Sequence, residues 1–159
     1  MAATAAVPLL SACGFQLRQA PEFAFKTLVL AMPATELSTE LRRQLQGTGR
    51  ITVLNPGEAG ADTADMVLQS AGEHRERTVV SVTASGEVRE FQLRIRFGFH
   101  LRTPGGRELL PPTDIERQID QSYSESAALS KETEALMLYR TMQGDIVQQV
   151  MRQLATVKT

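Results

Sequence analysis

The chain has 159 residues, of which 42% are hydrophobic, and a formal net charge of −1. This length predicts one domain with a substantial apolar core, and the charge gives no overall preference for nucleic acid or for an anionic membrane. One cysteine excludes an internal disulfide and a multi-cysteine metal site. No apolar run reaches the length that a membrane-spanning helix needs.

The N-terminal stretch MAATAAVPLLSAC is small and apolar up to that cysteine. Residues 1–12 are typical of the end of a secretory signal, so we interpret them as a signal-peptide remnant. The sequence LSAC, ending at Cys13, is similar to the lipobox of bacterial lipoproteins, in which the cysteine receives the lipid. Acyl chains such as palmitate would anchor residues 13–24, because each buried methylene adds about 0.8 kcal/mol of membrane affinity. The alternative is an incidental cysteine in a frayed terminus.

The first third of the folded region is predicted to form a strand, a helix and a second strand. The apolar run at residues 25–32 predicts a buried strand. In the stretch that follows, leucine recurs every four residues and predicts an amphipathic helix, with Thr35 or Ser38 as its cap. The sequence RITVLNPG then predicts a second short strand, ended by Asn-Pro-Gly.

The clearest pattern is an alternation from Phe91 to Leu101, in which every second residue is apolar. A period of two over eleven residues predicts a strand with one face in the core. Turn sequences, ASGE and TPGGR, flank it and predict neighbouring strands within residues 66–83 and 107–122. Two prolines near the start of the later strand predict an edge or a bulge there, because proline cannot donate to a ladder.

The last part of the chain predicts a long amphipathic helix. Apolar residues recur at steps of four, and four more widen the stripe: Leu138, Met142, Ile146, Val150 and Leu154, with Leu136, Tyr139, Val147 and Met151. Ser130 or Thr133 is the expected cap. The sequence therefore predicts an α+β fold for residues 25–157, a single sandwich domain. Its two helices pack on one face of a mixed four-stranded, possibly five-stranded sheet whose other face is polar.

We find no residue set that predicts catalysis. The two histidines, His74 and His100, lie in polar surroundings without a nucleophile or a phosphate-binding loop. Asp114, Glu116 and Asp120 alternate with apolar residues, which is more typical of a solvated strand face than of a metal site. We therefore expect no enzyme activity, no cofactor and no metal.

Residues 72–107 hold seven arginines and four glutamates, an excess of positive charge in a chain of net charge −1. Arginine pairs bidentately with phosphate and carboxylate, and Arg94 and Arg96 share a strand face because they lie two residues apart. This arginine-rich region is either a solvated sheet face or a binding site for an anionic partner, such as a phosphorylated glycolipid. No aromatic residues alternate with these arginines on the polar face, which argues against single-stranded nucleic acid.

The order of several motifs resembles the LptE family of lipopolysaccharide-assembly lipoproteins. CGFQLR follows the lipobox-like sequence, then come the helix LRRQL, the hairpin SGEVREFQLRIRFGFHL, the turn PGGRELLPP and the helix entry ALSKETEA. The resemblance implies an outer-membrane lipoprotein, anchored on the periplasmic side by lipid on Cys13. It also implies a plug inside the LptD β-barrel that assists barrel assembly and binds lipopolysaccharide.

By the same resemblance, Arg94, Arg96 and Lys131 are the candidates for contact with lipid A phosphates. The family's hairpin tip often carries a basic residue, whereas this chain has Thr83, Ala84, Ser85 and Gly86 there. The alternative function is a lipid-anchored periplasmic adaptor that scaffolds an envelope complex without binding glycolipid. A hydrolase is a distant third, because no catalytic set is visible.

Overall fold

The computed structural model describes residues 21–158. The elements follow in the order β1 (Thr27–Ala31), α1 (Glu36–Gly47), β2 (Thr52–Leu54), β3 (Met66–Val82), β4 (Val88–Arg102), β5 (Glu108–Ser122) and α2 (Ala128–Thr156), with short 3₁₀ turns at Ala61–Thr63 and Glu125–Ala127. The α+β class and both predicted helices are confirmed, and the sheet has five strands.

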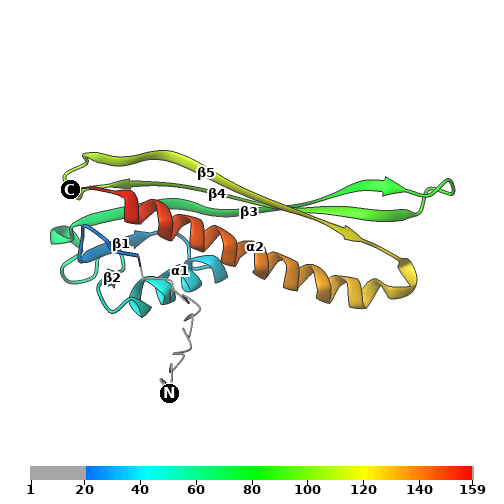
Figure 1. Ribbon diagram of the computed structural model, residues 1–159, viewed down its shortest axis with the longest axis horizontal. Coiled ribbons are helices and arrows are strands. Elements are labelled where there is room, and N and C mark those ends of the chain that lie inside the picture. The colour runs from blue at the N-terminus through cyan, green and yellow to red at the C-terminus, as the bar shows by residue number, and fades with distance from the viewer. Residues whose placement is uncertain (1–20, 159) are drawn as a thin grey trace, which may run out of the picture.

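The strands form one mixed sheet in the order β2-β1-β3-β4-β5. β1 is parallel to β2 and to β3, whereas β3, β4 and β5 form an antiparallel meander. β1 pairs only with residues 66–69 of β3, so most of β3 extends beyond the end of β1. Figure 1 shows the result: a head of β1, β2 and α1 at one end, and a long arm formed by the β3–β4 hairpin at the other.

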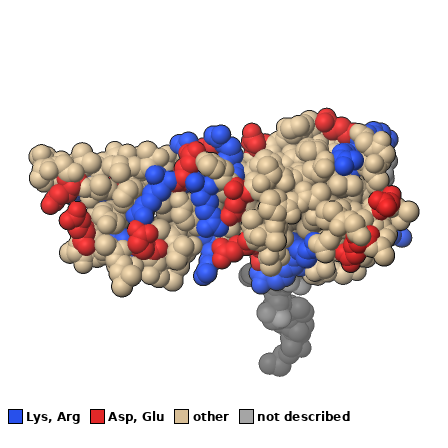
Figure 2. All heavy atoms as spheres, turned by 180° about the vertical axis from the view of Figure 1, so that it is seen from behind, with Lys and Arg blue, Asp and Glu red and all other residues tan. Residues whose placement is uncertain are grey.

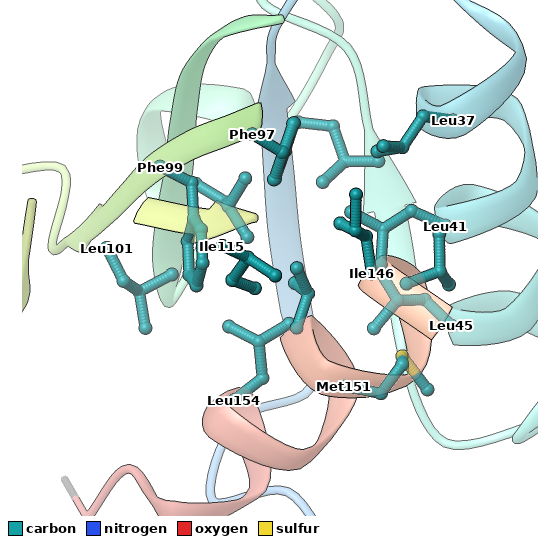
Figure 3. Close-up of a cluster of buried hydrophobic side chains, with 14 of the residues drawn as sticks. Leu37, Leu41, Leu45, Phe97, Phe99, Leu101, Ile115, Ile146, Met151 and Leu154 are labelled. Atoms are coloured by element: carbon teal, nitrogen blue, oxygen red, sulfur yellow. The ribbon is translucent and has the colours of Figure 1, made fainter. Parts of the chain in front are cut away.

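Both helices cover the same face of the sheet. Leucines of α1 and the C-terminal half of α2 meet the apolar face of β4 and β5 in one core, as Figure 3 shows. The side chains that alternate inward along β4 are those that the sequence pattern selects, and Leu93, Ile95 and Leu101 are fully buried. At roughly 1.5–3 kcal/mol for each buried large apolar side chain, this cluster is the main stabilising contribution to the head.

The start of α1 is a capping box. The Thr35 hydroxyl accepts a hydrogen bond from the Ser38 amide at 3.2 Å, and the Ser38 hydroxyl accepts one from the Thr35 amide at 2.8 Å. Thr35 is therefore the cap, and two amides that the first helical turn leaves unpaired are satisfied.

The predicted start of α2 is wrong. The helix begins at Ala128, directly after the 3₁₀ turn, and no side chain caps it. The Ser130 hydroxyl donates to the Ala127 carbonyl and the Thr133 hydroxyl to the Leu129 carbonyl, so both lie inside the helix. The helix continues directly from the 3₁₀ turn. It therefore starts before Ser130 and Thr133, the two residues whose hydroxyl groups are suited to capping.

The prediction that Leu136 widens the apolar stripe is also wrong, because its side chain is exposed. The stripe from Met142 to Leu154 is buried as predicted. The N-terminal half of α2 lies along the arm and packs on it through Ala135, Leu138 and Tyr139, which leaves Leu136 on the outer side. Ala135 is the one fully buried apolar residue before Met142 in this helix.

The face of the sheet opposite the helices is not wholly polar, contrary to the prediction. In the head, Val29 and Val67 are buried in a second, small apolar cluster beneath the segment that contains Ala61 and Ala64. Alternation places Val29 between the core residues Leu28 and Leu30, so β1 is covered on both faces. The prolines act as predicted, since β5 is an edge strand and its register shifts between its pairs with Phe99 and Leu101.

A bulge in β3 marks the passage from head to arm. Gly72 has φ +101°, a conformation that L side chains rarely adopt, and Pro33 lies 3.5 Å from where a Cβ would be. The Ser70 hydroxyl accepts a hydrogen bond from the Gly72 amide and donates one to the Gly98 carbonyl across the hairpin. The bulge therefore ties the two long strands together where β1 ends its pairing.

We expect Gly72→Ala to lower the free energy of unfolding by about 1–3 kcal/mol, because alanine would be forced into a strained backbone conformation. Urea denaturation followed by circular dichroism measures this. Gly47→Ala, at the end of α1 with open space around it, is the matched control and should be neutral or slightly stabilising. Equal midpoints for the wild type and Gly72→Ala would contradict the assignment of strain to this residue.

Candidate functional site

Arg94 and Arg96 lie together, as predicted, on the sheet face away from the helices. They belong to a cross-strand cluster that we call the outer ion-pair band: Glu76 of β3, Arg94 and Arg96 of β4, and Glu116 of β5. Register explains the cluster, because Arg94 is opposite Glu76 and Arg96 is opposite Glu116. Figure 2 shows acidic and basic side chains alternating across the middle of the molecule.

Glu116 is shared by the two arginines. Its carboxylate accepts from Arg96 at 3.0 and 3.3 Å and lies 3.5 Å from the Arg94 guanidinium. The hydrogen bond and the charge of Glu116 raise the pKa of Arg96 above its usual range, so this side chain stays cationic. Arg94 lies 3.7 Å from Glu76, a longer contact than that of Arg96. An anionic ligand at this band would have to share or displace Glu116.

Arg75 and Arg77 do not lie on this face. They are opposite Ile95 and Leu93, so they point toward α2. The expectation of one arginine-rich polar face is therefore wrong: alternation divides the arginines between the two faces of the hairpin. The helix-facing pair lies between the arm and α2, beside the buried apolar side chains of Leu93 and Ile95.

Arg77 is held on three sides. Its guanidinium lies 3.8 Å from the centroid of the Phe91 ring and 5.8 Å from that of Tyr123, and it donates to Glu132 of α2 at 2.6 Å. Phe91 and Tyr123 themselves meet edge to face. We call this cluster the arginine sandwich. It connects β3, β4, the end of β5 and α2 through cation–π and ionic contacts.

A second polar contact fixes α2 about two turns further along the helix than Glu132. Tyr139 donates from its hydroxyl to the Glu76 carbonyl at 2.8 Å, and Arg75 lies over its ring. Burial raises the pKa of Tyr139, with the nearby arginines opposing the shift, so the phenol stays a donor at neutral pH. Buried Gln143 donates to both carboxylate oxygens of Glu73, which also pairs with Arg75. The arm and α2 are thus joined by polar contacts at several levels.

Lys131 does not join Arg94 and Arg96. It lies in the first turn of α2, on the helix side of the molecule, and its ammonium contacts Glu134 at 2.8 Å and Ser122 at 3.1 Å. The three predicted contact residues therefore make two separate groups, the outer ion-pair band and a site at the junction of β5 with α2. Cys13 lies outside the described residues.

Across residues 21–158, no three histidine, cysteine or acidic side chains come together as a metal site would require. Neither helix in that part of the chain has the length and apolar character needed to cross a bilayer. The surface of this part of the chain carries charged and apolar side chains along an extended arm.

Two features of the structure were not predicted from the residue pattern. The first is the arginine sandwich, for which the alternation of Arg75 and Arg77 with Glu76 was the available signal. The second is Glu116, interpreted as one solvated acid among three although it bridges both candidate arginines. Both depend on strand register, which only the pairing of β3 with β4 and of β4 with β5 defines.

The fold and this surface define a class: an α+β module with a long β-hairpin arm, suited to binding and assembly. The chain belongs to the LptE family. The family model, described as lipopolysaccharide-assembly, matches residues 25–154, which takes in every strand and all but the last two residues of α2.

Solved structures agree with this assignment. The solution structure of an uncharacterized lipoprotein B from Nitrosomonas europaea is 30% identical, with a TM-score of 0.74 over 89% of this chain and 90% of that one. Rare lipoprotein B from Shewanella oneidensis (22% identity, TM-score 0.69, 82% and 95% covered) and a minor lipoprotein from Acinetobacter baumannii (21%, 0.65, 87% and 99%) share the fold. A search of curated proteins gives no match.

We expect Arg77→Ala to loosen the N-terminal half of α2 while leaving the head intact. The lost cation–π contact and ion pair are each worth about 0.5–1 kcal/mol. Amide hydrogen exchange should therefore show protection of residues 131–141 falling about tenfold, with residues 146–154 unchanged. Arg94→Ala, at the same level of the arm but on the outer face, is the control. Equal protection in both variants would refute a role for the arginine sandwich in docking the helix.

Proposed function

We propose that this protein is the lipoprotein subunit of a lipopolysaccharide translocon, forming the plug of an LptD-type β-barrel. In this role it assists assembly of the barrel and binds lipopolysaccharide on its way to the cell surface. The observation that carries the proposal is the match of residues 25–154 to the LptE family. A lipid on Cys13 would hold the protein on the periplasmic side of the outer membrane.

The shape supports a plug. The long arm and α2 run side by side and make a rod rather than a sphere (Figure 1). Their contacts combine buried apolar side chains with polar pairs, through the arginine sandwich, Tyr139 and Gln143. Apart from the buried Oε1 of Gln121, the polar groups that join the two are hydrogen-bonded within the molecule, which would help such a rod to keep its shape against a barrel wall.

The outer ion-pair band supports contact with lipid A phosphates, with Glu116 as a competitor for the two arginines. Arg96 is half exposed and keeps unshared donor capacity, since two of its five N–H groups are used by Glu116. Arg94 has longer ion pairs and one hydrogen bond of 3.0 Å to Gln92. Arginine pairs bidentately with phosphate as well as with carboxylate, so a phosphate group can compete with Glu116 for the two side chains.

The plug is tested by purifying the full-length protein with its own anchor from detergent-solubilised outer membranes and identifying co-purified proteins by mass spectrometry. We expect one large β-barrel in stoichiometric amount. A properly lipidated protein that brings down no barrel would refute the plug and leave the alternative of an envelope adaptor.

The band is tested by binding of purified lipopolysaccharide. The double change Arg94→Glu and Arg96→Glu should weaken binding at least tenfold, whereas Glu116→Gln should strengthen it because both arginines are released. The double change Arg50→Glu and Arg152→Glu, at exposed positions in the head, is the control of equal charge. Circular dichroism checks the fold of each variant. Unchanged binding in the first variant would move the glycolipid site elsewhere, with Lys131→Glu as the next variant to measure.

A further inference from the structure

Exposed apolar side chains gather in the distal half of the molecule. Among the residues that the structure describes, six large hydrophobic side chains are exposed: Val79, Val80, Val82, Leu129, Leu136 and Met137. Three lie at the tip of the β3–β4 hairpin and three on the N-terminal half of α2. The head, by contrast, buries its large apolar residues.

The hairpin tip is uncharged as well as apolar. The nine residues from Thr78 to Gly86 contain no charged side chain, and the next four bring two glutamates and one arginine. On the face that Figure 2 shows, the far end of the arm carries uncharged and acidic side chains, and basic ones begin further in. The tip therefore differs from the ion-paired middle of the arm in both hydrophobicity and charge.

The tip also extends well past the core. The last fully buried residue toward it on β4 is Leu93, opposite Arg77. At about 3.4 Å per residue, Val82 lies about 17 Å further out. β5 ends opposite Glu90, so the tip beyond that point consists of two strands. It is the far end of the arm in Figure 1.

The turn that closes the tip pairs several of its own polar groups. The Thr83 amide donates to the Glu87 carbonyl at 2.8 Å, the Gly86 amide to the Thr83 carbonyl at 3.0 Å, and the Glu87 amide to the Thr83 hydroxyl at 3.0 Å. That hydroxyl also lies 2.7 Å from the Ser85 hydroxyl. Because these groups are already paired and the turn is preorganised, its burial in an apolar site costs little desolvation or ordering entropy.

The head holds a turn of the same design. There the Thr103 amide donates to the Arg107 carbonyl at 2.8 Å, the Gly106 amide to the Thr103 carbonyl at 2.9 Å, and the Arg107 amide to the Thr103 hydroxyl at 3.1 Å. Arg102 precedes this turn and Arg107 closes it, whereas Val82 precedes the tip turn and Glu87 closes it. The shared turn geometry thus serves hairpin closure, and the apolar residue before the turn is specific to the tip.

The chemistry of the tip favours a protein pocket over a lipid surface. Segments that contact phosphate-bearing lipid supply lysine, arginine or aromatic side chains, and residues 78–86 have none. The nearby excess of glutamate over arginine would repel anionic headgroups. An uncharged pocket lined by aliphatic side chains has no such conflict, and branched valines on a rigid hairpin lose little side-chain entropy when buried in it.

We propose that the hairpin tip, Thr78–Gly86, is an apolar docking finger that inserts into an uncharged aliphatic pocket of the barrel partner. This inference rests on the proposed function, since it assumes that the partner is the barrel. It assigns the tip to protein contact and leaves anion binding to other parts of the surface.

The test uses full-length lipidated protein co-expressed with the LptD-type barrel of the same organism, and measures the barrel retained per molecule purified. Ala84→Asp and Ala84→Lys place a charge of either sign in the exposed tip turn. Pro104→Asp and Pro104→Lys place the same charges at the equivalent position of the head turn. We expect both Ala84 variants to reduce retained barrel at least tenfold and both Pro104 variants to retain it.

Each other outcome contradicts the inference in a different way. Loss with Ala84→Asp but gain with Ala84→Lys would identify a site for an anionic partner. Retention in all four variants would show that the tip is not buried by the barrel, with the proposed function still standing. No barrel with the wild-type protein would overturn the docking finger and the plug together.

Discussion

The antiparallel pairing of β3 with β4 is the constraint on which the rest of this structure depends. The two strands have 17 and 15 residues and are in register from Val67–Arg102 to Val82–Val88, with local shifts at the bulges. A strand has two faces, so every residue of this hairpin is assigned either to the helices or to the outer surface. The core, the arginine sandwich and the outer ion-pair band all follow from that assignment.

The character of the hairpin changes along its length because its neighbours change. In the head it is covered by β1, β5 and both helices, and its inward residues are large and apolar. Along the arm only β5 and the N-terminal half of α2 accompany it, and arginines with aromatic and acidic partners lie beside the buried Leu93 and Ile95. At the tip it has no neighbour among the described residues, and valines are exposed on it.

This gradient gives the function proposed here a physical basis. An arm built from paired polar contacts remains extended without a thick hydrophobic core, and so can enter a confined space. The charges of its middle part are largely matched within the molecule, so that an anionic ligand has to compete with Glu116. The tip has no charged side chains, so a partner that binds it breaks no ion pair there. Its internally hydrogen-bonded turn suits close contact with another protein.

Hydrophobic periodicity is a local property, so the strands, the helices and the buried faces of β4, α1 and the C-terminal half of α2 could be predicted from the residues alone. The alternation from Phe91 to Leu101, the leucines of α1 and the stripe from Met142 to Leu154 each predict their burial correctly. Family motifs along the chain likewise indicated the LptE family. Tertiary structure alone decided which charged groups meet, since that depends on register between strands far apart in the chain. It separated Arg75 and Arg77 from Arg94 and Arg96, placed Glu116 between the latter pair, and left Lys131 on the other side. It also decided that Leu136 is exposed, because this half of α2 packs on the arm through Ala135, Leu138 and Tyr139 and leaves Leu136 on the outer side.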